Sequence, residues 1–114
     1  MSVQTIRDAL ISAVGNQVGH YEPDKSWKDG YAVYGETGAP VMVSGDDEAL
    51  QLVLTGEAYY YTTAEFDKTV DAICNAFTAA GVSWSVVQIG YDADLKQITY
   101  QIHWEVPCGP GEIY

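Results

Sequence analysis

Basic residues are scarce in this chain. Its 114 residues include five Lys and Arg against sixteen Asp and Glu, which gives a formal net charge of -11. A protein with this balance has no net electrostatic attraction to phosphate backbones or to anionic lipid. Binding to DNA through a basic face is therefore not expected, and we predict no specific contact with nucleic acid.

Cysteines and long apolar runs are scarce as well. Cys74 and Cys108 form no CxxC pair, which excludes a disulfide framework and leaves too few ligands for structural zinc. No uncharged apolar run approaches the roughly 20 residues that span a bilayer. The first residues also lack the charged and apolar regions of a secretory signal. We therefore expect a protein that is made in the cytoplasm and has no membrane partner.

Motifs for catalysis and cofactor binding are missing. The chain contains no GxSxG, no P-loop and no GxGxxG. His20 lies in a polar segment, and His103 lies between Gln101 and Glu105 in an alternating pattern, where a lone imidazole is usually a hydrogen-bonded surface group. We predict no enzymatic activity, no catalytic residue, no cofactor and no metal ion.

The hydrophobic content is sufficient for one packed core. Apolar residues make up 47% of the chain, and 114 residues is the length of one ordinary domain. We predict a single α+β domain over residues 1–114. After the last strand pattern, residues 107–114 have no evident partner in the chain and are expected to be flexible or to dock on a partner.

Two segments have the periodicity of amphipathic helices. The first covers residues 3–14, with Ser2 in the N-cap position and Gly15 after the last turn. The second follows Thr62, whose spacing to Glu65 is that of a capping box. Its apolar stripe is expected to pack on a sheet, ends before Gly81 and comprises Phe66, Val70, Ile73, Phe77 and Ala80.

The remaining patterns are typical of strands. YAVYG at 31–35 is short. ALQLVLTGEAYYYTT at 49–63 contains Gly56, where we expect a bulge or a bend, with the following tyrosines divided between two faces. WSVVQIGYDADLKQITYQIHWEV at 84–106 predicts a hairpin with its turn at 92–94. This order predicts a two-layer α+β sandwich, an antiparallel or mixed sheet with two helices packed on one face.

The order of elements resembles the tail terminator, or tail completion, proteins of long-tailed bacteriophages and prophages. The resemblance covers residues 2 to about 106 and rests on YAVYGETG, SGDDEAL, EAYYYTT, AEFDKTVDAICNAFTAAG and ITYQIHWEV. It implies a structural minor tail protein that acts in virion assembly, where a hexameric ring caps the tail tube and offers the head-attachment surface. The implied partners are other copies of the chain, the tail tube protein and the head-completion protein, and DNA passes through the ring. The implied location is the bacterial cytoplasm during assembly and then the virion tail.

The acidic cluster Asp46, Asp47 and Glu48 has three interpretations. It forms a solvated turn that leads into a strand, or it lines the bore or rim of a ring, where its charge repels passing DNA. The third interpretation is a metal site, although the alternating oxygens and central Gly of an EF-hand loop are missing. All three remain open from the sequence.

Tyr31, Tyr59 and Tyr61 are candidates for a subunit interface. Tyrosine is enriched at interfaces, and we expect these side chains on edge strands and out of phase with the core. The alternative function for the whole chain is that of an acidic head-tail connector or a DNA-mimic type of binding protein without catalytic activity, which the net charge also favours.

Overall fold

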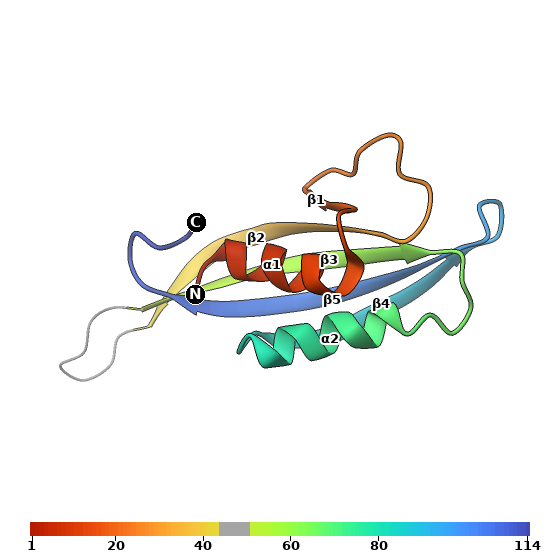
Figure 1. The fold of residues 1–114 in the computed structure, drawn as a ribbon. Helices are drawn as coiled ribbons and strands as arrows, with labels where there is room; N and C mark the ends of the chain where they lie inside the picture. Colours follow the sequence, from red (N-terminus) through yellow and green to blue (C-terminus); the bar gives the residue numbers. More distant parts are fainter. Residues whose placement is uncertain (44–50) are drawn as a thin grey trace.

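The computed structural model describes residues 1–43 and 51–114, in which two helices lie on one side of a five-stranded sheet (Figure 1). This confirms the predicted α+β sandwich. In chain order the elements are α1 (Val3–Val14), β1 (Val18–His20), β2 (Tyr31–Val43), β3 (Gln51–Thr62), α2 (Thr69–Ala79), β4 (Ser83–Asp92) and β5 (Gln97–Cys108).

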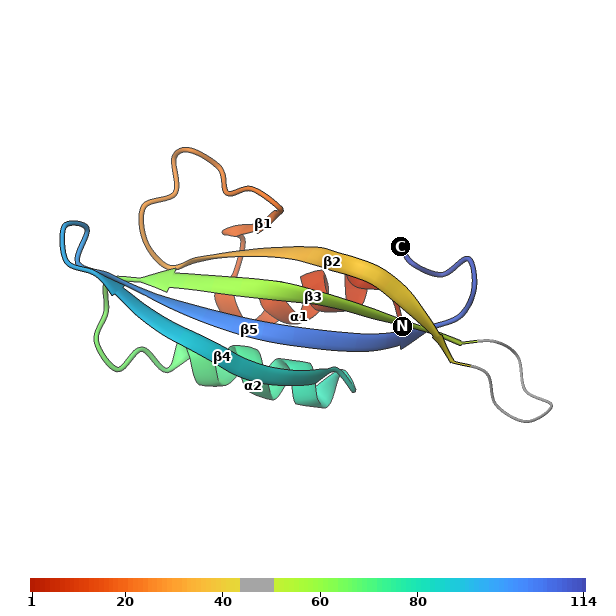
Figure 2. The same ribbon diagram turned by 180° about the vertical axis from the view of Figure 1, so that it is seen from behind.

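The sheet is mixed, with the strand order β1-β2-β3-β5-β4. Only the short pairing of β1 with β2 is parallel among the described strands, and the other neighbours are antiparallel. Figure 2 shows the sheet in front of both helices. The side of the sheet that faces away from the helices is called the open face below.

The core lies between the helices and the sheet. In β3, every second residue from Leu54 to Thr62 is buried, as the two-residue repeat of a strand requires. α1 contributes Ile6 and Leu10, and Gly15 at its C-terminus has a positive φ of 96°. The largest fully buried apolar side chains are Trp104, Phe77, Ile6, Leu10, Ile73, Ile102 and Val106.

The start of α1 confirms the prediction from sequence. The side chain of Ser2 accepts a hydrogen bond from the backbone N–H of Gln4, and the Thr5 hydroxyl accepts one from the backbone N–H of Ser2. These bonds satisfy donors that have no partner within the helix. Neither described helix is long and apolar enough to cross a membrane.

The predicted start of the second helix is wrong. α2 begins at Thr69, and Thr62 is the last residue of β3. The Thr62 hydroxyl does not cap a helix but donates a hydrogen bond to the Asp67 carboxylate. This carboxylate also accepts a hydrogen bond from the backbone N–H of Thr69. Phe66 precedes the helix and is 92% exposed, so it is absent from the core where the stripe placed it.

Two strand predictions are also wrong. β2 does not end near Gly35 but continues to Val43, with a register shift between Thr37 and Val41. Gly56 is not a bulge, because the pairing of β3 with both neighbours continues through it. Glycine is required there for a different reason: a Cβ atom would lie 2.1 Å from Cζ2 of Trp104.

The predicted tail after the last strand has partners in the chain. Pro107 and Cys108 extend β5 and pair with β3. Ile113 packs against the core, and its carbonyl accepts the backbone N–H of Val3 at 2.8 Å. The end of the chain is therefore attached to the start of α1.

Candidate functional site on the open face of the sheet

The acidic cluster lies outside the described residues. Asp46, Asp47 and Glu48 belong to the segment between β2 and β3 that the structure does not describe. The three interpretations of this cluster therefore remain predictions.

The three predicted tyrosines lie together on the open face. Tyr31 and Tyr61 are cross-strand partners whose rings stack at a centroid distance of 4.7 Å, and the Tyr59 ring lies 6.4 Å from that of Tyr61. Trp27, from the loop before β2, packs beside Tyr31 at 6.2 Å. These residues form the tyrosine cluster. It lies on interior strands, so the expectation of an edge-strand position is wrong.

A shallow pocket of about 240 Å³ adjoins this cluster. Tyr59 and Tyr61 form one part of its lining, and Tyr21 and Pro23 from the loop after β1 form another. The loop can approach closely because Gly35 has no side chain, and the Tyr21 ring occupies the space that one would need. Residues from both sides thus make an aromatic depression open to solvent.

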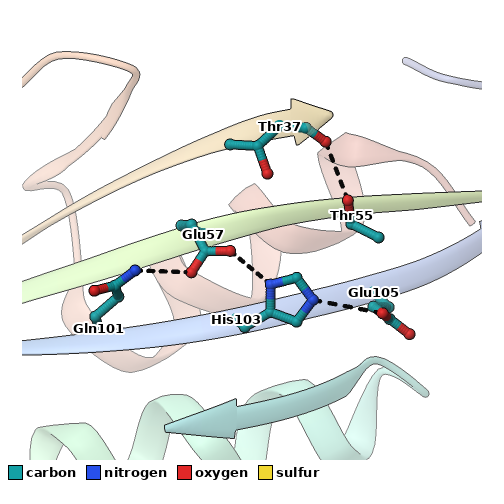
Figure 3. Close-up of polar contacts among 6 residues, drawn as sticks. All are labelled: Thr37, Thr55, Glu57, Gln101, His103 and Glu105. Atoms are coloured by element: carbon teal, nitrogen blue, oxygen red, sulfur yellow. Dashed lines mark hydrogen bonds and ion pairs between the residues drawn. The ribbon is translucent and has the colours of Figure 1, made fainter. Parts of the chain in front are cut away.

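A polar network continues the open face toward β5. Glu57 lies at its centre (Figure 3). One of its carboxylate oxygens accepts a hydrogen bond from the Gln101 side-chain amide at 3.0 Å, and the other lies 2.6 Å from His103 Nδ1. His103 Nε2 lies 3.4 Å from Glu105. The imidazole is therefore placed between two carboxylates.

The network changes the protonation of its histidine. The hydrogen bond to Glu57 is the largest cause that raises the pKa of His103, and Glu105 acts in the same direction against partial burial. A protonated imidazole donates from both nitrogens, so both carboxylates stabilise this form. His103 thus places a titratable positive charge within an acidic surface.

A second histidine–glutamate pair lies beside β1. His20 Nε2 is 2.6 Å from one carboxylate oxygen of Glu36. The other carboxylate oxygen accepts a hydrogen bond from the Tyr114 hydroxyl. Burial raises the pKa of Glu36, but the hydrogen bonds from His20 and Tyr114 outweigh it and lower the pKa overall. The bond to Glu36 raises the pKa of Tyr114 to about 12.

Tyrosines and a carboxylate lie side by side on the open face. Within residues 1–43 and 51–114, no group of three His, Cys, Asp or Glu side chains is arranged to hold a metal ion. Cys74 is buried, and desolvation raises the pKa of its thiol, which makes it a poor nucleophile. Half-buried tyrosines beside carboxylates instead offer apolar area and hydrogen bonds to another protein.

Sequence reasoning identified His103, Gln101 and Glu105 on the polar side of one strand but missed Glu57. Glu57 joins them because β3 pairs with β5 in a register that aligns Glu57 with His103. Alternation shows which face a residue occupies, but it carries no information on the register of a distant strand.

Comparison with known proteins shows a likeness in fold. No known protein family matches the sequence, and no curated protein matches it. A solved chain from the "Virion of native gene transfer agent (GTA) particle" has a similar fold, with a TM-score of 0.56 and 15% sequence identity. The likeness covers 92% of this chain and 89% of that chain. At this identity the likeness concerns the fold, which the two chains share over nearly their full lengths.

Proposed function

We propose that this protein is a structural subunit of a phage or prophage tail, of the tail terminator type. Several copies would form a hexameric ring on the end of the tail tube, stop its elongation and offer a surface to the head-completion protein. The observation that carries this proposal is the nearly full-length fold likeness to a chain of a gene transfer agent virion.

The surface chemistry supports a role in assembly. The open face joins the tyrosine cluster to a network with Glu57 at its centre, and Tyr31, Tyr59 and Tyr61 remain partly exposed in the single chain. We assign Tyr31, Tyr59 and Tyr61 to contact with a neighbouring virion protein. Large side chains that end in a hydroxyl suit a contact that is exposed before assembly and buried after it.

The acidic character supports a passage for DNA. At a net charge of -11 the chain repels a phosphate backbone, so a ring of such subunits would not retain passing DNA. We place Asp46, Asp47 and Glu48 at the bore or rim of that ring. The proposal requires no catalytic residue, cofactor or metal ion.

Capping of tail tubes tests the proposed function. Purified protein is added to growing tubes of the tail tube protein from the same particle, and tube length is followed by electron microscopy. We expect rings at tube ends and an early stop to growth. A variant with Tyr59→Ser and Tyr61→Ser should remain folded and cap less efficiently. A Leu95→Ser variant, in the turn between β4 and β5, reports the effect of losing an exposed apolar side chain outside the proposed contacts.

Tubes that grow to the same lengths with and without the protein, and that carry no protein at their ends, would contradict the tail terminator function.

A further inference from the structure

Edge strand β4 carries a row of exposed apolar side chains. It is the last strand of the sheet, with β5 on its inner side and no described strand on its outer side. On the side that faces α2, exposure reaches 63% for Ile89 and 66% for Tyr91. We call this row, with the exposed Phe66 next to it, the β4 strip; it consists of Phe66, Trp84, Val86, Ile89 and Tyr91.

The strip borders two shallow hollows. One, of about 480 Å³, lies between β4 and α2 and includes Val70 and Cys74 in its lining. The other, of about 370 Å³, is lined by Phe66 and Tyr91. Ile89 and Tyr100 belong to both linings, so the two hollows are neighbours along the strand, and we call them together the groove. Its lining is mainly apolar and includes the carboxylates of Glu65 and Asp71.

Two residues of the strip are held in exposed positions. Phe66 has a positive φ of 54°, a conformation unfavourable for a bulky side chain, and it is almost fully exposed. The Trp84 indole donates to the Thr78 hydroxyl at 2.9 Å, which fixes the ring at the end of the groove. Large exposed apolar side chains of this kind are typical of an interface.

The charge distribution identifies the kind of partner. The chain has no Asp, Glu, Lys or Arg between Asp71 and Asp92, a stretch that includes most of α2 and nearly all of β4. The five side chains of the strip are uncharged, and the carboxylates of Glu65 and Asp71 lie in the linings of the hollows beside it. A partner that is itself strongly acidic meets less repulsion at the strip than at a surface rich in carboxylates.

The edge also lacks two of the common protections against pairing. Natural edge strands often carry Lys or Pro, and β4 has neither. Its one irregularity is the register shift between Val86 and Gln88. The backbone and the apolar side chains of β4 therefore remain available to a second chain.

We infer that the β4 strip is the surface on which a second copy of this chain docks. The inference deepens the proposed function, on which it rests for the number of copies, because it names the contact that would join neighbouring subunits. The second copy covers the groove between β4 and α2, and its own charge of -11 is tolerated because the five side chains of the strip carry no charge. The buried apolar area supplies the attraction.

A matched pair of substitutions tests this contact. Ile89→Lys places a charge in the strip, whereas Ile11→Lys makes the same change on α1, at a side chain that is 41% exposed. Both variants alter the net charge equally. Sedimentation velocity in 0.5 to 1 M NaCl, over a concentration series up to about 1 mM, measures self-association at a Debye length of about 3 to 4 Å.

We expect the wild type and Ile11→Lys to self-associate with similar dissociation constants, and Ile89→Lys to do so at least tenfold more weakly. Circular dichroism and thermal unfolding check that the variants are folded. Ile89→Thr, which retains a β-branched side chain, replaces Ile89→Lys if the lysine prevents folding and should also weaken association.

Two results would overturn the inference: a wild type that stays monomeric throughout the series, or a folded Ile89 variant that associates as tightly as Ile11→Lys. The tube-capping assay separates this outcome from the proposed function. Capping with unchanged association of the Ile89 variant would overturn the inference alone. Association through the strip without capping would support the inference and contradict the tail terminator function.

Discussion

The indole of Trp104 lies against the α-carbon of Gly56, its cross-strand partner on β3. A methyl group at Gly56 would lie 2.1 Å from the Trp104 ring and 2.3 Å from the carbonyl oxygen of Gly35. Because both neighbours are held in the sheet and core, Gly56→Ala should lower the free energy of unfolding by about 3 kcal/mol. Urea unfolding measures it, and Gly90→Ala, where a Cβ meets no atom within 4 Å, is the control. Equal stability of the two variants would contradict the close approach.

Two phenylalanines of the predicted helical stripe should differ sharply in their effect on stability. Phe77 is fully buried, so Phe77→Ala removes a packed ring and leaves a cavity, at a cost of about 3 kcal/mol or more. Phe66 is almost fully exposed, and Phe66→Asn should change stability by less than about 0.5 kcal/mol, because Asn tolerates its positive φ. Thermal and urea unfolding of both variants would reveal the contrast. A large loss on changing Phe66 would place it in the core after all.

Asp67 should stabilise the connection between β3 and α2. Partial burial raises its pKa, but hydrogen bonds from the Thr69 N–H and the Tyr60 and Thr62 hydroxyls outweigh this and lower it to about 2. Asp67→Ala leaves two hydroxyls without their acceptor and should cost about 2 kcal/mol at neutral pH.

The same carboxylate gives a dependence on acid. A lowered folded-state pKa means that its stabilising contribution is complete above the ordinary value of 3.8 and is lost as the pH falls through about 2. The stability difference between wild type and Asp67→Asn should therefore shrink over this range. A difference that stays constant in acid would remove the carboxylate from this role.

His103 should give a dependence of opposite sign. Its pKa is raised above 6.5 by Glu57, so the contribution of their interaction is complete below pH 6.5 and is lost as the pH rises through the raised value. The melting temperature of wild type should exceed that of Glu57→Gln by more at pH about 6 than at pH about 9. An NMR titration of the His103 ring, assigned with His103→Gln, should have a midpoint above 6.5 that falls in Glu57→Gln. An unchanged midpoint would contradict the pairing.

Charge should limit assembly of the proposed ring. Subunits of charge -11 repel around a common axis, so salt that shortens the Debye length from about 10 Å at 0.1 M to about 3 Å at 1 M should favour assembly. A variant with Asp46→Asn, Asp47→Asn and Glu48→Gln should fold normally and assemble at lower salt than the wild type. Analytical ultracentrifugation across a salt series measures this. Equal or weaker assembly of the variant would leave the solvated turn as the interpretation of the cluster.

The helix at the start of the chain and the last hairpin could be predicted because their signals are local, although the turn of that hairpin covers residues 93–96 rather than 92–94. Ser2 and Gly15 bracket a stripe with helical spacing, and residues 98–106 alternate at every step. The second helix was placed too early because Thr62 and Glu65 have the spacing of a capping box, whereas Asp67 and the end of β3 take the bonds that would have started the helix. A capping-box spacing fails where another nearby side chain takes the hydrogen bonds of the expected cap.

By itself, the sequence determined the fold class, the acidic charge and the membership of each face of the well-patterned strands, because these follow from composition and from the periods of helix and strand. Only the tertiary structure decided that Glu57 meets His103, that Tyr31 stacks on Tyr61, and that β4 lies at the edge of the sheet. Strand order and register depend on packing between segments far apart in the chain, and a one-residue change of register would move every side chain of a strand to the opposite face.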